Sequence, residues 1–275
     1  MHNNLGYILQ KENNNLDLIR LLLAFGVIYG HVPIFILYSK HYDIVSKIFP
    51  FTYCGNMAVL AFFFISGLLV SNSLFLKKNI LDYLLSRIFR IYPALIVVLI
   101  LSCILSFKYS DTTLHRYFHH AWMYFYHNIT MNFVGTIDTV SYMTQNYPLN
   151  GQYAQVTNGS LWTIPLEIKM YWLLLASYLF ATITKSFKKP VLPIILSIGI
   201  LSPYIFSSQL LGGNNRETLY LIPMFCLGAL FAYYKDKIAG SLSLLSALFI
   251  EEPCMKLKKT ISKKCSIIME KLCKQ

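Results

Sequence analysis

Long apolar stretches recur along the chain and alternate with short polar segments. Stretches of spanning or near-spanning length occur at about 16–38, 56–76, 91–107, 161–183, 191–210 and 217–234, with a shorter one at 238–250. A helix that crosses a bilayer needs about 20 apolar residues and satisfies its own backbone hydrogen bonds. The pattern therefore predicts an all-α fold, a polytopic transmembrane helix bundle with about 6–8 spans.

One further segment, residues 114–135, departs from this pattern. It is rich in aromatic residues, carries four histidines and is less uniformly apolar than the other stretches. A helix that combines aromatic and basic side chains is typical of the membrane interface. We therefore interpret this segment as interfacial or re-entrant and not as a span.

Composition supports a membrane protein with one embedded domain. Of the 275 residues, 56% are hydrophobic and only 13% are charged, which is unusual for a soluble domain. The polar segments between the apolar stretches are too short to bury a core of their own. We expect a membrane-embedded domain over residues 1–250 and a basic cytosolic tail over residues 251–275.

The net charge of +12 is explained by its distribution along the chain. Lysine and arginine are concentrated in alternate connecting segments, so most of the 24 basic residues fall on one side of the membrane. By the positive-inside rule, this side and the N-terminus are cytosolic. Counting residues 114–135 as a span would invert this pattern. The charge therefore indicates topology and contact with membrane lipid, and no nucleic-acid partner.

The first apolar stretch carries two costly polar side chains, Arg20 and His31. They are eleven residues apart, so on a helix they differ by about 20° and lie roughly 16 Å apart along the axis. This places Arg20 near the cytosolic surface and His31 near the bilayer midplane, where an imidazole suggests function. A structural hydrogen bond to a neighbouring helix is the alternative. Pro33 predicts a bend beside His31, and an imidazole suits a general base.

Three more charged residues could take part in the same chemistry. Asp17 lies three residues before Arg20, so the two could pair at the cytosolic end of the helix or act as an interfacial anchor. Arg87 and Arg90 have the same spacing in SRIFRIYPAL, before the next span. Two guanidiniums on one helix face could hold a phosphate, although arginines at this position also serve as topology anchors.

Glu167 lies within the apolar segment SLWTIPLEIKMYWLLL, residues 160–175, about 9 Å below its outer end. A carboxylate at this depth needs a partner or a proton. Lys169 faces about 200° away, so we expect Glu167 to face another helix or a polar cavity that also holds His31. A pair with some other buried cation is the alternative. Ser66, with Gly67, lies within the second apolar stretch, where small residues allow close helix packing.

Neither a nucleophilic-serine motif nor a metal-binding motif occurs in the sequence, so we expect no metal. Four segments resemble, in order, the motifs of the acyltransferase 3 family of bacterial integral-membrane O-acyltransferases. These are LDLIRLLLAFGVIYGH (16–31), FFFISGLLVSNSL (62–74), SRIFRIYPAL (86–95) and LWTIPLEIKMYWLL (161–174). The resemblance implies transfer of an acyl group, by default acetyl, from acyl-CoA to a hydroxyl of a carbohydrate or glycolipid. It also implies a location in the bacterial inner membrane, and no tightly bound cofactor.

The resemblance also implies roles for residues of these motifs. His31 resembles the essential histidine, and Glu167 resembles the motif glutamate. The motif arginines are Arg20, Arg87 and Arg90, and the motifs also contain Asp17, Ser66 and Trp162. Our hypothesis is that the arginines hold the phosphates of CoA at the cytosolic mouth of a tunnel. His31 then either activates the acceptor hydroxyl or takes the acyl group covalently, and the sequence leaves both open.

The C-terminal third departs from the family pattern. Residues 222–237 resemble a later family helix and residues 249–260 resemble the closing helix end, yet only about a dozen residues separate them. Members of the family usually have additional spans there, so the chain resembles a shortened member. Two other functions are consistent with the sequence: a proton-coupled transporter or flippase that uses His31 and Glu167, and an inactive truncated remnant.

Overall fold

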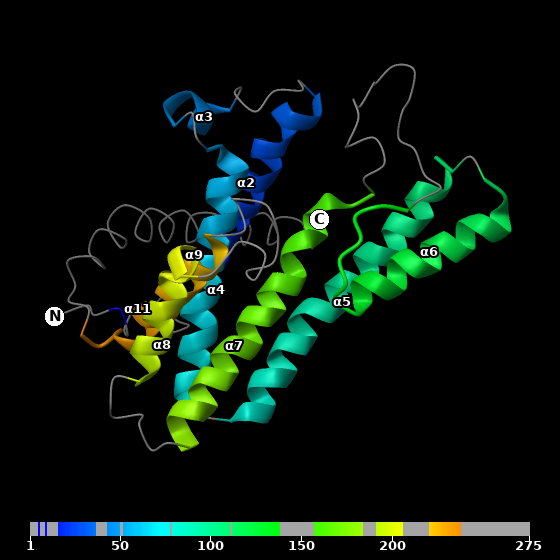
Figure 1. The fold of residues 1–275 in the computed structure, drawn as a ribbon. Helices are drawn as coiled ribbons and strands as arrows, with labels where there is room; N and C mark the ends of the chain where they lie inside the picture. Colours follow the sequence, from blue (N-terminus) through cyan, green and yellow to red (C-terminus); the bar gives the residue numbers. More distant parts are fainter. Residues whose placement is uncertain are drawn as a thin grey trace, which may run out of the picture. The chain divides into compact units, whose positions relative to one another are not determined.

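The computed structural model describes residues 5, 9, 16–36, 43–49, 52–77, 79–110, 112–137, 157–183, 191–205 and 220–237. Within these ranges the chain is helical and contains no strand, which confirms the predicted all-α class (Figure 1). The chain divides into two compact units. The first comprises residues 1–75 and 184–275, and the second comprises residues 76–183.

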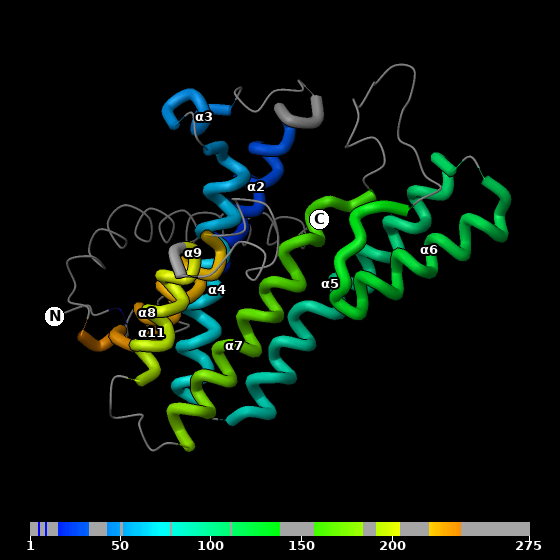
Figure 2. The backbone as a smooth tube through the Cα atoms, in the orientation of Figure 1, coloured from blue at the N-terminus to red at the C-terminus, as the bar shows by residue number. Residues whose placement is uncertain are grey.

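The first unit contains six helices among its described residues. They are α2 (Leu16–Ile36), α3 (Ile44–Ile48), α4 (Cys54–Lys77), α8 (Val191–Ile200), α9 (Ser202–Ile205) and α11 (Leu221–Tyr233). Helices α8 and α11 pack side by side, although about 20 residues separate them in the sequence (Figure 2). Helix α2 continues through Pro33 to Ile36, so the proline does not end it.

Glycines bring α4 and α11 into backbone contact. A Cβ on Gly67 would overlap the main-chain carbonyl oxygen of Phe225, and a Cβ on Gly228 would lie 2.8 Å from the main-chain nitrogen of Leu68. Such close approach is possible only where both helices lack a side chain at the contact. The predicted packing role of Gly67 is therefore confirmed, and the neighbouring Ser66 is buried.

The second unit contains α5 (Ile80–Phe107), α6 (Leu114–Ile129), a 3-10 turn η2 (Gly159–Trp162) and α7 (Thr163–Ile183). Helix α6 folds back along α5 (Figure 2). Its buried positions recur at helical spacing and include Tyr117 and Tyr124, which join Leu95 and Leu99 of α5 in one apolar cluster. The aromatic segment is thus a helix of 16 residues, too short to cross a bilayer when straight.

Three helical segments in the described part of the chain are long and apolar enough to cross a membrane: α4, α5, and η2 continued by α7. Helices α8 and α11 are apolar but shorter. Together these segments indicate an integral membrane protein. The count of about 6–8 spans stays a prediction. The doubtful span at 238–250 and the tail at 251–275 lie outside the described residues.

Two helices differ in extent from the apolar runs that indicated them. The apolar run covers 91–107, but α5 begins at Ile80, where the Asn79 side chain accepts a hydrogen bond from the Leu81 main-chain N–H at 3.0 Å. Hydropathy marks where a helix becomes apolar, whereas a cap marks where it begins. The run at 191–210 is also interrupted, because α8 ends at Ile200 and α9 begins at Ser202, beside Pro203.

Candidate active site

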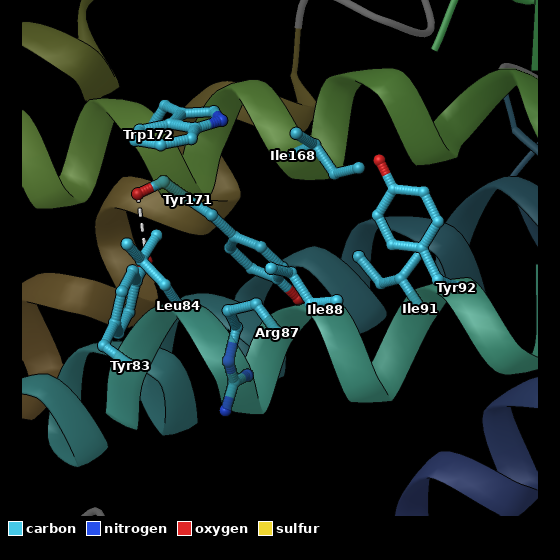
Figure 3. A pocket seen from close by; sticks show the side chains of 9 residues that line it. All are labelled: Tyr83, Leu84, Arg87, Ile88, Ile91, Tyr92, Ile168, Tyr171 and Trp172. Carbon is cyan, nitrogen blue, oxygen red and sulfur yellow. Dashed lines mark hydrogen bonds between the residues drawn. The ribbon is translucent and has the colours of Figure 1, made fainter. Parts of the chain in front are cut away.

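Tyr171 of α7 joins two of the predicted site residues in the second unit. Its hydroxyl donates a hydrogen bond to Oε1 of Glu167, one helical turn earlier. Its ring lies under the Arg87 guanidinium, with the Cζ atom 5.6 Å from the ring centroid, within the range of a cation–π contact. Figure 3 shows the Tyr171 side chain reaching from α7 toward α5, which carries Arg87. The sequence predicted Arg87 and Glu167 but missed the tyrosine that connects them.

The tyrosine is itself fixed by a third contact. The Tyr83 hydroxyl donates a hydrogen bond of 2.9 Å to the main-chain carbonyl oxygen of Tyr171 (Figure 3, dashed line). Both tyrosines are buried, at 3% and 4% exposure. A buried hydroxyl without a partner would be costly, and here each has one. The contact holds α5 against α7 at the level of the arginine.

Arg87 and Arg90 have different surroundings. Arg87 is partly buried, and its Nε donates to the Ser86 hydroxyl at 3.3 Å. Its Nη1 is buried and has no hydrogen-bond partner among the described residues. Arg90 is exposed. A buried guanidinium N–H requires an acceptor, and phosphate and carboxylate oxygens suit it best.

A cavity of about 320 Å³ lies beside these residues, between α5 and α7 (Figure 3). Most of its walls are apolar, and Arg87 is its one cationic lining residue. The lining residues are Tyr83, Leu84, Arg87, Ile88, Ile91 and Tyr92 from α5 and Ile168, Tyr171 and Trp172 from α7. The chemistry suits a ligand that has an anionic group at one end and a less polar arm.

Glu167 and its motif neighbours lie at the start of α7. Lys169 is exposed. Trp162 is half-buried in the 3-10 turn η2, whose first residues are capped by the Asn158 side chain. The prediction that Glu167 shares a cavity with His31 joins residues of the two units and stays a prediction.

His31 is oriented within the first unit by three contacts. Its Nδ1 lies 2.7 Å from the main-chain carbonyl oxygen of Val27, and its ring meets Tyr53 edge-on, with centroids 5.9 Å apart. A Cβ on Gly55 would lie 3.1 Å from Nδ1, so the ring packs on the start of α4. Because a carbonyl oxygen only accepts, Nδ1 carries the proton and the neutral ring has its lone pair on Nε2. This tautomer suits a base that acts through Nε2.

Asp43 stabilises the start of α4, on which the His31 ring packs. Its carboxylate is 1% exposed and accepts hydrogen bonds from the main-chain N–H groups of Ser46 and Cys54, both at 2.5 Å. One side chain therefore caps both α3 and α4. Burial raises the pKa of the Asp43 carboxyl, but these hydrogen bonds outweigh burial and hold the pKa below its usual value. The sequence analysis missed this residue, although aspartate is a preferred N-cap residue.

At the other end of the same unit, Arg20 forms the predicted pair with Asp17, with Nη1 and Oδ1 3.7 Å apart. The Asp17 side chain is 97% exposed and that of Arg20 is 18% exposed. An apolar cluster that includes Leu16, Leu68 and Ala232 joins the start of α2 to α4 and α11. Here a contact that the sequence did not predict ties α4 to the turn that follows α11: Lys235 Nζ donates to Asn72 Oδ1 at 2.8 Å.

The helical fold, the apolar helices and the arginine, glutamate and histidine within them define a membrane protein with ionisable groups in its helices, a pattern that marks function. The chain belongs to the acyltransferase 3 family, since the family model, described as an acyltransferase domain, matches residues 13–250. This confirms the resemblance stated above.

Two relatives give the match more detail. The chain is 27% identical over 246 residues to an O-acetyl transferase of Shigella phage Sf6, a match that covers 82% of this chain and 63% of the relative. It is 27% identical over 164 residues to nodulation protein 10 of Rhizobium leguminosarum bv. viciae, which covers 58% of this chain and 42% of the relative. The chain thus spans less than two thirds of each relative's length. No solved structure matches the chain significantly.

Proposed function

We propose that the protein is a membrane O-acyltransferase that transfers an acyl group, by default acetyl, from acyl-CoA to a hydroxyl of a cell-surface carbohydrate. The observation that carries the proposal is Arg87, a motif residue whose buried Nη1 has no acceptor among the described residues and which lines an apolar cavity. Family membership and the phage relative named an O-acetyl transferase support acyl transfer to oxygen.

The chemistry of the arginines supports acyl-CoA as the donor. CoA carries phosphates, which guanidinium groups bind through charge-assisted hydrogen bonds. Arg87 and Arg90 of α5 take this role, together with Arg20 of α2. The apolar cavity beside Arg87 suits the less polar arm that carries the thioester.

His31 handles the proton of the reaction. Its Nε2 takes the proton from the acceptor hydroxyl, the hydroxyl oxygen attacks the thioester carbonyl carbon, and the carbon–sulfur bond breaks. The imidazolium then returns the proton to the departing thiolate, so the products are the acyl ester and free CoA. The Val27 carbonyl, which accepts from Nδ1, favours the imidazolium that forms. A covalent acyl-histidine route uses the same nitrogen and is the second possibility.

The family resemblance supports the proposed acceptor and location. We propose a carbohydrate or glycolipid acceptor and a bacterial inner membrane with the N-terminus in the cytosol. The excess of basic residues on the segments assigned to the cytosol supports this orientation. Acyl-CoA made in the cytosol then reaches the arginines directly.

Mass spectrometry of surface polysaccharide tests the proposal. Cells that express the protein should show an added acetyl mass on the polysaccharide, and cells that express His31→Ala at the same level should not. An unchanged polysaccharide with an altered pool of an exported solute would favour a transporter instead. An acetylated polysaccharide in the His31→Ala cells would remove the histidine from the mechanism.

A further inference from the structure

Tyr171 is the residue through which Arg87 and Glu167 meet. It is almost fully buried, at 4% exposure, yet each polar part of it has a partner. The hydroxyl donates to Glu167, the main-chain carbonyl accepts from Tyr83, and the ring lies against the Arg87 guanidinium. A residue that served only to pack the interior would not need all three of these contacts.

The hydroxyl fixes the carboxylate of Glu167. A glutamate side chain has several rotatable bonds, and holding it in one position costs conformational entropy. A tyrosine one turn away on the same helix face lies within reach and has fewer rotatable bonds. The hydrogen bond therefore limits where the Glu167 oxygens lie.

The ring fixes the guanidinium of Arg87. A cation–π contact orients a guanidinium without using its N–H groups. The Nε donates to Ser86, while Nη1 is buried and has no partner among the described residues. The guanidinium is thus held by the ring and by Nε, and its buried Nη1 remains for an anion.

We propose that Tyr171 is a positioning residue, whose hydroxyl orients the Glu167 carboxylate and whose ring presents the Arg87 guanidinium to the phosphates of the donor. This inference rests on the proposed function. The hydroxyl and the ring of Tyr171 have separate roles, so substitutions can test the two roles separately.

The experiment measures acetyl transfer from radiolabelled acetyl-CoA to glycan in membrane vesicles from cells that express the full chain. Tyr171→Phe removes the hydroxyl and keeps the ring. We expect kcat to fall roughly 10- to 100-fold, because the Glu167 carboxylate is no longer held in one position. KM for acetyl-CoA should change by about twofold or less. Tyr171→Leu removes the ring as well, so KM for acetyl-CoA should also rise about tenfold.

The matched control is Tyr178→Phe. Tyr178 is a buried tyrosine of the same helix, two turns further on, and is not among the residues that line the cavity. This variant should stay within about twofold of the wild type in both constants. Thermal unfolding of each purified variant in nanodiscs shows that it is folded, and Tyr171→Phe alone decides the outcome if Tyr171→Leu does not fold.

The results distinguish a failure of the proposed acyl transfer from a failure of the proposed role of Tyr171. If the wild type transfers no label, the proposed function fails. If the wild type transfers label and Tyr171→Phe matches it, or if Tyr171→Phe and Tyr178→Phe lose activity equally, the positioning role is overturned while acyl transfer stands. A fall in kcat confined to the Tyr171 variants supports the inference.

Discussion

The hydroxyl of Tyr83 on α5 donates a hydrogen bond of 2.9 Å to the main-chain carbonyl oxygen of Tyr171 on α7, 88 residues later in the chain. It joins the two helices at the point where Arg87 lies over the Tyr171 ring. A side chain that bonds to a helix backbone holds the partner helix in one position along its axis. The site in the second unit is thus supported by an interaction that does not itself involve Arg87 or Glu167.

Replacing Tyr83 by Phe tests this support. The variant keeps the ring and loses the hydroxyl, so it should lower the free energy of unfolding by about 1 kcal/mol, the usual net value of one hydrogen bond. Thermal unfolding in nanodiscs measures the change. Tyr92→Phe is the control, because Tyr92 lines the same cavity but is only half-buried. Equal stability of Tyr83→Phe and Tyr92→Phe would show that the bond does not hold the helices.

The contact between α4 and α11 leaves no room for a methyl group at Gly67. A Cβ there would overlap the Phe225 carbonyl oxygen, which is backbone and cannot rotate away. Gly67→Ala should therefore destabilise the protein by about 1–3 kcal/mol. In Gly26→Ala the new Cβ would meet Ala58 at 3.4 Å, an ordinary contact, so stability should be unchanged or slightly higher. The unfolding temperatures of the two variants give the comparison, and an unaffected Gly67→Ala would contradict the close helix contact.

Asp43 gives the protein a stability that depends on pH. Hydrogen bonds hold its pKa below the ordinary value of 3.8, so the folded state prefers the charged form. This contribution is complete above the ordinary pKa and is lost as pH falls through the lowered pKa. Unfolding measured by urea at pH 7 and at lower pH should show a smaller loss in Asp43→Asn than in the wild type. The variant should also be less stable at pH 7, because an amide NH₂ cannot accept from Cys54.

An Asp43→Asn variant that is as stable as the wild type at pH 7 would contradict this prediction. It would mean that the carboxylate does not cap α4 and does not support the helix start on which His31 packs.

Substitutions of Lys235 and Lys237 are expected to change the stability of the protein by different amounts, although the two residues lie two positions apart. Lys235 donates to Asn72, which is 7% exposed, so Lys235→Met leaves a nearly buried amide oxygen without this donor and should cost about 1–3 kcal/mol. Lys237 is exposed and lies 5.9 Å from the Tyr234 ring, a contact worth about 0.5–1 kcal/mol at an exposed site. Thermal unfolding of the two Met variants measures the difference. A Lys237→Met variant that is the less stable of the two would contradict this ranking.

The apolar pattern predicted the helices but not where they begin. Apolar residues over 91–107 indicate a helix that prefers lipid, yet they contain no information about the cap at Asn79, from which α5 starts. The same pattern treated 191–210 as one segment, although Pro203 has no N–H with which to continue α8 into α9. Boundaries depend on caps and prolines, and a hydropathy pattern does not weigh them.

The sequence could predict those contacts of the site that lie within a single helix. The spacing of Asp17 and Arg20 predicted their pair. The spacing of Glu167 and Tyr171 by four residues is also a local signal and could have been used. The contacts of Arg87 with Tyr171 and of Lys235 with Asn72 join residues far apart in the chain, and no local period encodes them.

Transfer of radiolabelled acetyl from acetyl-CoA to glycan, measured in inverted vesicles with the wild type and with His31→Ala, tests the central claim most directly. The donor is added on the cytosolic face, where the arginines are proposed to bind it. The expected result is label in the glycan with the wild type and none above background with His31→Ala. An unlabelled glycan with the wild type, or equal labelling with His31→Ala, would contradict the claim that this chain transfers acyl groups through His31.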